Sequence, residues 1–469
     1  MGKILSGYLM PHPPIIVEEI GRGEEQRARE TLEGCKTIAK DIRDKRPTTI
    51  IIISPHGPLF ADAISISVEE NLKGDFRNFG NRGLKFHFIN NKKLVDEIIA
   101  ESYRQDIMIA KVDQDFAKSY NIDGDLDHGA LVPLYFVDKE YRDFELIHIT
   151  YGLLPPRELY RFGNIIKEKS LESEEDVVLI ASGDLSHKLS DDGPYSYSPY
   201  GEQFDKKIVN LLEEGDFKSV SAFDLELSER AGECGLRSLM ILAGFLDGLI
   251  ITPEILSYEG PFGVGYCNAM FGVEGKAEEE NIFEELTVLE EKRIKDIRKG
   301  EDEYVKLARN SLEHYIKEGN IMDVPKDLSR KLLNHRHGAF VTLKKDGILR
   351  GCIGTIEPTR SSLAEEIIHN AISAGLKDPR FEPVGEEELS HLVYSVDVLY
   401  PPEPISSIEE LDVERYGVIV SKGFRKGLLL PNIEGVDTPR EQVSIALRKA
   451  GIGEHEDYKL ERFEVERHF

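Results

Sequence analysis

The sequence predicts an α/β protein of two domains, a mostly parallel-sheet α/β domain followed by an α+β domain. Residues 1–270 alternate short apolar runs with helical patterns, the order that βαβ units and a parallel sheet require. The run TTIIIIS at 48–54 is apolar almost throughout, as expected of a strand buried on both faces. The length of 469 residues also exceeds the roughly 100–200 residues of one domain.

The elements of the first domain follow from this alternation. We expect strands at residues 3–10, 48–54, 64–68, 144–150 and 177–181, and helices at 24–46, 91–103, 156–169, 200–214 and 229–246. The glycine-rich stretch GPFGVGYCNAMFGV is expected to turn into a closing strand.

A highly charged segment at 274–303 marks the expected boundary, because charge runs are usually linkers or solvated faces. We therefore expect a domain at 1–275, a charged linker at 276–300 and a second domain at 301–469. The second domain should open with a helix at 303–318. It continues with hairpin-like strands around HGAFVTLKKDGILRGCIG, where Asp346-Gly347 is a turn signal.

Composition excludes several classes of function. With 59 basic and 86 acidic residues the formal net charge is −27, so nucleic acid is a poor partner. No apolar run approaches the roughly 18 residues of a membrane span, and we read MGKILSGYLMPHPP as a strand rather than a signal peptide. The four cysteines form no C-x-x-C pair, which argues against a disulfide framework or structural zinc and favours the cytoplasm.

Three histidines each follow a predicted strand: His12 in LMPHPP, His56 in IIIISPHGP and His187 in VVLIASGDLSHK. Ligands in open α/β sheets bind at the carboxyl ends of strands, where these residues fall. Flanking prolines keep His12 extended, and His56 lies between a proline and a glycine. One such histidine is more often a hydrogen-bonded turn residue than a ligand, but several together favour a site.

Glu233 is the carboxylate that could complete a metal site with His12 and His56. Two histidines and one carboxylate form the ligand set of non-haem Fe(II) oxygenases. A capping carboxylate at a helix N-terminus is an equally good reading of Glu233 alone. Asp184 and His187 could form a carboxylate–imidazole pair of the kind that orients a general base, or a simple turn without function.

Residues 1–275 resemble the LigB-type, class III extradiol ring-cleavage dioxygenases. The resemblance rests on PHPP at 11–14, SPHG at 54–57, DHG at 127–129, SGDLSH at 182–187 and the GEC segment at Glu233. It implies an Fe(II) triad of His12, His56 and Glu233, with His187 as catalytic base. His128 would then contact substrate or oxygen. The Memo family shares these histidines but usually has cysteine as third ligand; Cys234 adjoins Glu233 here, and we favour Glu233.

Residues from about 290 to 469 resemble the AMMECR domain. The hallmark is LRGCIG at 349–354, supported by HGAFVTL at 337–343, DPRF at 378–381 and GLLLP at 427–431. Arg350, Gly351, Cys352 and Gly354 offer a guanidinium, a thiol and two positions for close backbone approach. A pocket is one reading, and a tight strand with a buried cysteine is at least as good. The domain pairing resembles the AmmeMemoRadiSam system, which implies a radical-SAM protein partner.

The leading hypothesis is an Fe(II)-dependent extradiol dioxygenase that cleaves a catecholic substrate with O₂. His187 would accept a substrate hydroxyl proton, and His128 and Asp184 would assist. Two alternatives stay open: a zinc-dependent hydrolase, and a Memo-like metal-binding accessory protein without oxygenase activity. An aromatic small molecule is the expected substrate, and a homodimer is compatible with the sequence.

Overall fold

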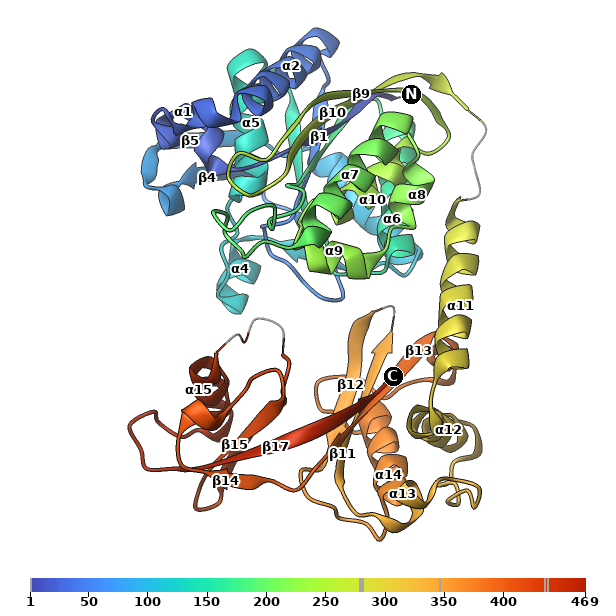
Figure 1. Cartoon of the computed structure of the whole chain (residues 1–469). Helices are drawn as coiled ribbons and strands as arrows, with labels where there is room; N and C mark the ends of the chain where they lie inside the picture. Colours follow the sequence, from blue (N-terminus) through green and yellow to red (C-terminus); the bar gives the residue numbers. More distant parts are fainter. Residues whose placement is uncertain (1, 278–281, 346, 434–435, 437) are drawn as a thin grey trace. The chain divides into compact units, whose positions relative to one another are not determined.

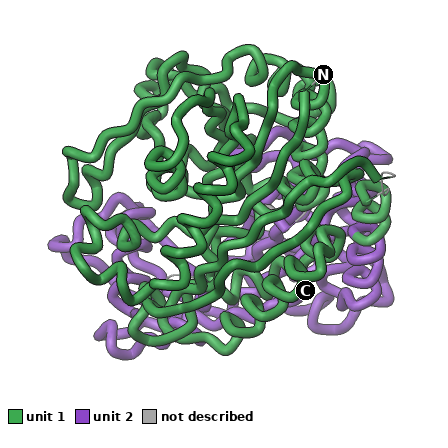
Figure 2. The backbone as a smooth tube through the Cα atoms, turned by 90° about the horizontal axis from the view of Figure 1, so that it is seen from above, with its two compact units in different colours: residues 1–289 green, residues 290–469 purple. Residues whose placement is uncertain are grey.

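The computed structural model describes residues 2–277, 282–345, 347–433, 436 and 438–469, and it divides the chain into two compact units, residues 1–289 and 290–469 (Figures 1 and 2). Asp346 of the expected turn therefore lies outside the described residues, while Gly347 has a φ of +83°. Within the described residues, no helix combines the length and hydropathy that crossing a membrane requires.

The first unit is built on an eight-stranded mixed sheet of order β6-β3-β7-β2-β8-β1-β10-β9. Its strands are β1 (Lys3–Met10), β2 (Thr49–Ser54), β3 (Ile64–Ser67), β6 (Ile109–Val112), β7 (Glu145–Thr150), β8 (Asp176–Ser182), β9 (Leu249–Glu259) and β10 (Tyr266–Lys276). The central strands β7, β2, β8 and β1 are mutually parallel, and β9, β10 and the β3–β7 pair are antiparallel. The expected mostly parallel α/β fold is confirmed. A separate hairpin joins β4 (Asn71–Phe76) and β5 (Asn81–Ile89).

Helices cover both faces of this sheet (Figure 1). The helices of this unit are α1 (Glu18–Gly21), α2 (Arg29–Lys45), α3 (Lys92–Arg104), α4 (Gln114–Tyr120), α5 (His128–Glu140), α6 (Pro156–Glu172), α7 (Pro199–Glu214), α8 (Phe217–Ser221), α9 (Leu225–Ala231) and α10 (Leu236–Leu246). Strand β2 is apolar on both of its faces, because its side chains alternate between the two cores that lie on either side of the sheet. Ile50 and Ile52 pack with α2 and α5, whereas Ile51 and Ile53 pack with α3, α6 and α10.

The prediction of a single helix at 229–246 is wrong, because the structure has two helices in this region. Helix α9 ends at Ala231, and Gly232 takes a left-handed conformation with φ +63°. Helix α10 begins again at Leu236. Glycine adopts positive φ without steric cost, which is why it commonly ends a helix. The four residues between the helices, 232–235, carry the predicted ligand.

Most of the described part of the expected linker is helical. Residues 278–281 lie outside the described residues, and α11 (Ile282–Gly300) follows. Ile282 and Leu286 pack into the core of the first unit. In the second unit, the Arg298 guanidinium donates to the backbone carbonyls of Leu389 and Leu392.

The second unit is α+β with an antiparallel sheet of order β12-β11-β13-β17-β15-β16, and β14 pairs with β17. Its strands are β11 (Gly338–Lys345), β12 (Ile348–Gly354), β13 (Leu392–Leu399), β14 (Glu403–Ile405), β15 (Tyr416–Lys422), β16 (Arg425–Leu429) and β17 (Lys459–His468). Its helices are α12 (Glu303–Glu318), α13 (Arg330–Asn334), α14 (Leu363–Leu376) and α15 (Pro439–Ala450). Helices α12 and α14 share a core with β11 and β13, while α15 packs on β15 and β16. This confirms the expected α+β class.

Candidate metal centre

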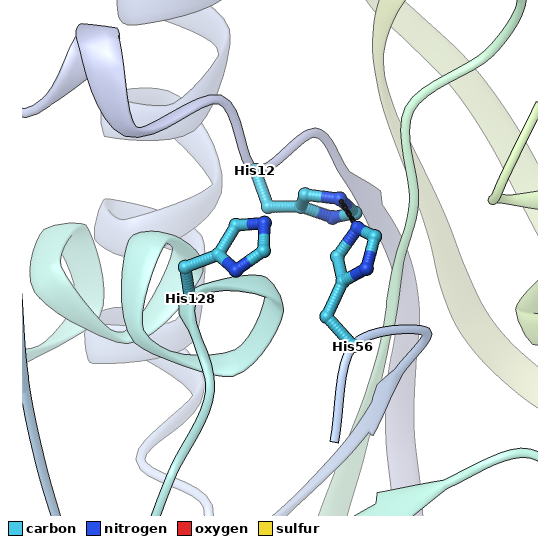
Figure 3. Close-up of side chains that lie close together, drawn as sticks. All are labelled: His12, His56 and His128. Carbon is cyan, nitrogen blue, oxygen red and sulfur yellow. Dashed lines mark hydrogen bonds between the residues drawn. The ribbon is translucent and has the colours of Figure 1, made fainter. Parts of the chain in front are cut away.

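Three imidazoles meet at the carboxyl edge of the parallel strands (Figure 3). One ring nitrogen from each of His12, His56 and His128 lies within 4.8 Å of the others. His12 follows β1, His56 follows β2 and His128 opens α5. In the part of the chain that the structure describes, no other three His, Cys, Asp or Glu side chains bring ligand atoms this close. The site lies where open α/β sheets bind their ligands.

His12 is held as a neutral ring with its Nε2 lone pair facing the cluster. The hydroxyl of Ser182 donates its hydrogen to the Gly129 carbonyl, so its oxygen accepts from His12 Nδ1 at 2.9 Å. Burial and the neighbouring imidazoles lower the pKa of His12 well below its ordinary value. A neutral imidazole whose second nitrogen is held by a hydrogen bond is the form that binds a metal.

His56 and His128 complete the group as neutral rings. His56 Nε2 lies 3.0 Å from His12 Nε2, and the His56 and His128 rings stack with centroids 4.4 Å apart. Burial lowers the pKa of His56, and burial together with His56 lowers that of His128 to about 4. Two nitrogens bound 2.0–2.1 Å from one ion would be separated by roughly 3.0–3.4 Å. The observed separation fits a shared divalent metal ion.

Cys234, which the sequence analysis ranked below Glu233, is the third-ligand candidate that faces the histidines in the structure. Its Sγ lies 3.6 Å from His12 Nε2 and 3.6 Å from His187 Nε2. Two ligands of one tetrahedral ion, one nitrogen and one sulfur, would be roughly 3.5 Å apart. A close backbone approach brings the thiol there: a Cβ on Gly183 would lie 2.2 Å from the Gly235 Cα. Only glycine permits that contact between the β8 loop and residues 232–235.

Glu233 is turned away from the imidazoles. Its Oε1 accepts from the Ser228 hydroxyl at 2.6 Å, and its Oε2 accepts from the Leu236 N–H at 2.6 Å. Consecutive side chains leave the backbone in different directions, so only one of Glu233 and Cys234 can face the histidines. The prediction of Glu233 as a metal ligand does not match this geometry, which gives it the capping role at the start of α10.

His187 joins the cluster from the loop after β8. Its Nε2 faces Cys234, and its ring stacks on that of Tyr195 with centroids 5.9 Å apart. Burial, with His56 and Lys188 nearby, lowers the pKa of His187 to about 4. His187 is therefore a neutral proton acceptor near pH 7.

Asp184 pairs with His12 rather than with His187 as predicted. Its Oδ1 accepts from the His12 backbone N–H at 2.9 Å, and its Oδ2 lies 3.9 Å from His12 Nε2. Burial raises the pKa of Asp184 to about 7. The carboxyl group thus holds the loop that carries His12, instead of orienting His187.

Sequence reasoning ranked Cys234 below Glu233, and it missed Ser182, Asp127 and His148 as parts of this site. Asp127 directly precedes His128, and a capping residue before a site histidine is a readable signal. His148 is the one ionisable residue among the apolar positions of ELIHIT, the interior of a buried strand. A polar residue at such a position needs a partner. Ser182 gave no comparable signal.

The motif LRGCIG in the second unit is packed rather than open. Arg350 makes a double hydrogen bond to Glu388, with 3.0 and 2.8 Å distances. A Cβ on Gly351 would lie 2.2 Å from the Ala374 carbonyl oxygen of α14, and one on Gly354 would lie 2.3 Å from the Phe340 ring. These glycines let β12 lie directly against its neighbours.

Cys352 is half-buried within this motif. Its Sγ accepts from the Thr342 hydroxyl at 3.3 Å, and its backbone N–H donates to Asp378 at 2.9 Å. Burial raises the pKa of the Cys352 thiol. A thiol with a raised pKa is a poor nucleophile, which favours a structural role.

Comparisons with known proteins identify one protein family for each of the two units. The family described as the catalytic LigB subunit of aromatic ring-opening dioxygenase matches residues 6–271, and the AMMECR1 family matches residues 305–468. Protein CA_C1420 of Clostridium acetobutylicum is 46% identical over 462 residues, 98% of each chain. A protein of Thermotoga maritima is 53% identical over 171 residues, which cover 36% of this chain and 98% of that protein.

A solved structure resembles part of the chain. The crystal structure of the uncharacterized protein PH0010 from Pyrococcus horikoshii is 38% identical, with a TM-score of 0.33. The likeness covers 35% of this chain and 88% of that one.

Proposed function

We propose that the first unit of this chain binds Fe(II) and uses O₂ to open the ring of a catecholic substrate. The premise is that the chain belongs to the LigB family, the catalytic subunits of aromatic ring-opening dioxygenases, and carries a fused AMMECR1 domain. The observation that supports this proposal is the meeting of three neutral imidazoles at the carboxyl edge of the sheet.

The residues present fit a divalent first-row metal. His12 and His56 would hold it, and His128 and Cys234 are the groups next to them. Imidazole nitrogen suits iron, zinc and copper alike. Bound Fe(II) would hold the substrate and O₂ together and let the substrate, made electron-rich by loss of a hydroxyl proton, donate electrons toward O₂.

His187 would accept the proton of a substrate hydroxyl. Its Nε2 faces the cluster, and its lowered pKa keeps it unprotonated near pH 7. His128 lies across the cluster beneath the exposed Phe79 ring, with centroids 5.1 Å apart, where it can donate to a bound ligand. Asp184 would act indirectly, because its carboxylate accepts from the His12 backbone N–H and so fixes the position of His12.

Anaerobic reconstitution with Fe(II) tests the proposal. Metal content and oxygen uptake with a panel of catechols are measured for the wild type, His12→Ala, His187→Ala and the control His87→Ala. His87 is an exposed histidine of β5 bonded to Asn71. We expect His12→Ala to lose iron, His187→Ala to keep iron but lose turnover, and the control to match the wild type. Iron loss in His187→Ala equal to that in His12→Ala would refute its role as base.

The position of Cys234 favours a second function, a Memo-like metal protein without oxygenase activity that works with a radical-SAM protein. A thiolate beside histidines also suits zinc and hydrolysis. Bound zinc with no oxygen uptake on any catechol would favour these alternatives. The four free cysteines fit the reducing cytoplasm under each of them.

A further inference from the structure

Asp127 caps the helix that presents His128. Its Oδ1 accepts from the backbone N–H groups of Gly129 at 2.7 Å and Ala130 at 3.3 Å. His128 is the first residue of α5, directly after this cap. The carboxylate therefore fixes the backbone from which the His128 ring extends.

The same carboxylate fixes the backbone of His56. The Ser54 hydroxyl donates to Asp127 Oδ1 at 2.5 Å, and the Ser54 oxygen accepts from the His56 backbone N–H at 3.2 Å. The next residue is Gly57, where a Cβ would lie 2.1 Å from Thr150 Oγ1 and 3.2 Å from Asp127 Oδ2. The loop that carries His56 is thus packed tightly over Asp127.

His148 holds the other oxygen of Asp127. Its Nε2 lies 3.0 Å from Asp127 Oδ2, and its Nδ1 lies 3.0 Å from the Ser67 hydroxyl. Burial opposes ionisation of Asp127, but the hydrogen bonds from His148 and Ser54 bring its pKa to about 2. Because an ionised carboxylate only accepts, His148 Nε2–H is the donor.

The Ser67–His148–Asp127 arrangement is not a hydrolytic triad. Ser67 is 5% exposed and His148 is 2% exposed. The cavity beside Ser67 has a volume of about 10 Å³, which no ester or amide substrate could enter. The hydrogen bonds of Asp127 instead hold the backbone segments that carry His56 and His128.

We propose that Asp127, held by His148, is the residue that positions His56 and His128 in the metal centre. One carboxylate fixes the backbone at both His56 and His128, and so sets where their ring nitrogens lie relative to His12 Nε2. The inference rests on the metal centre proposed above. It adds that His148, which no metal ion would touch, controls the affinity and geometry of that centre.

Binding of Co(II) alone to the full-length apoprotein tests this role, with the dissociation constant and the visible ligand-field spectrum as readouts. The variants are Asp127→Ala, His148→Ala and His148→Gln. Gln at 148 keeps an N–H donor near the place of Nε2. The matched control is Asp113→Ala, since Asp113 caps α4 of the same unit through the Phe116 N–H at 2.7 Å.

We expect Asp127→Ala and His148→Ala to weaken Co(II) binding about 10- to 100-fold, the range for partners of metal-bound histidines, and to change the spectrum. His148→Gln and Asp113→Ala should retain the wild-type spectrum. Tight Co(II) binding with an unchanged spectrum in both alanine variants would overturn the positioning role of Asp127 but leave the proposed metal centre standing. Wild-type protein that binds no Co(II) would instead overturn the centre itself. If Asp127→Ala fails to fold, the His148→Ala and His148→Gln pair decides.

Discussion

Replacing Glu233 and its neighbour Cys234 separately should have opposite effects on metal binding and stability. Glu233 accepts two hydrogen bonds within its own segment, from Ser228 and Leu236, both at 2.6 Å. Cys234 faces His12 and His187 instead. Glu233→Ala should therefore lower stability and keep the metal, whereas Cys234→Ala should keep most of the stability and weaken metal binding.

The magnitudes follow from the contacts. Each hydrogen bond to a partly exposed carboxylate contributes about 1 to 2 kcal/mol, so Glu233→Ala should cost about 2 to 4 kcal/mol. For a unit of this size that is a fall of roughly 4 to 8 °C in Tm. Cys234→Ala removes one buried sulfur and should cost about 1 to 2 kcal/mol. Its loss of metal affinity should be at least the roughly 10- to 100-fold seen for outer partners of a metal.

Thermal unfolding followed by circular dichroism and metal titration of the same preparations separate the two effects. Glu233→Gln is the matched control, because its amide oxygen can still accept from the Leu236 N–H. It should recover most of the stability lost in Glu233→Ala. Loss of metal from Glu233→Ala with full retention in Cys234→Ala would refute the geometric assignment and restore the carboxylate as the ligand.

Three further predictions concern packing, pH and the thiol of the second unit. Gly183→Ala should cost about 1 to 3 kcal/mol and lower metal content, because its Cβ has no room, while Gly272→Ala, with nothing within 4 Å, should match the wild type in both assays. Burial opposes ionisation of Glu388, but hydrogen bonds led by the one from Arg350 lower its pKa from 4.5 to about 2. The ionised carboxylate should therefore contribute about 3 kcal/mol to the free energy of unfolding above pH 4.5, and this contribution should be lost as the pH falls to 2. Acid unfolding of Arg350→Met should show a shallower loss across that window, and an equally steep curve would contradict the pairing. Cys352 should react slowly with a thiol probe at neutral pH because burial raises its pKa, and rapid labelling with a midpoint below that of a free thiol would contradict this.

Local patterns in the sequence predicted most of the first unit, because strand burial and helix periodicity are local properties. Strand β1 matches the expected residues 3–10, and β2 begins one residue later than expected. The strand ends then placed His12, His56 and His187 at one edge of the sheet, since parallel strands share that edge. His128 was predicted beside them and belongs to the closest group.

Contacts between distant segments could not be read from the sequence. Whether Glu233 or Cys234 faces the histidines depends on where α9 stops, and that depends on Gly232 and on the contact of Gly235 with Gly183. The three-residue spacing of Asp184 and His187 suggested a local pair, but the loop carries Asp184 back to the His12 backbone. In each case a contact across more than 50 residues overrode the local pattern.

The position of β1 inside the sheet has a consequence for the order of folding. This strand is synthesised before the other strands of its sheet, yet its partners are β8 and β10, so that Leu9 pairs with Ala181 and Ala269. Synthesis at roughly 5–20 residues per second would keep the strand waiting on the order of 15 to 50 s for β10. Such non-local pairing also slows folding. His12 and Cys234 cannot face each other until α10 has been made, so a metal centre that includes both would form only after most of the first unit has been synthesised. Until then, the nascent edge of β1 is the segment that chaperones would have to cover.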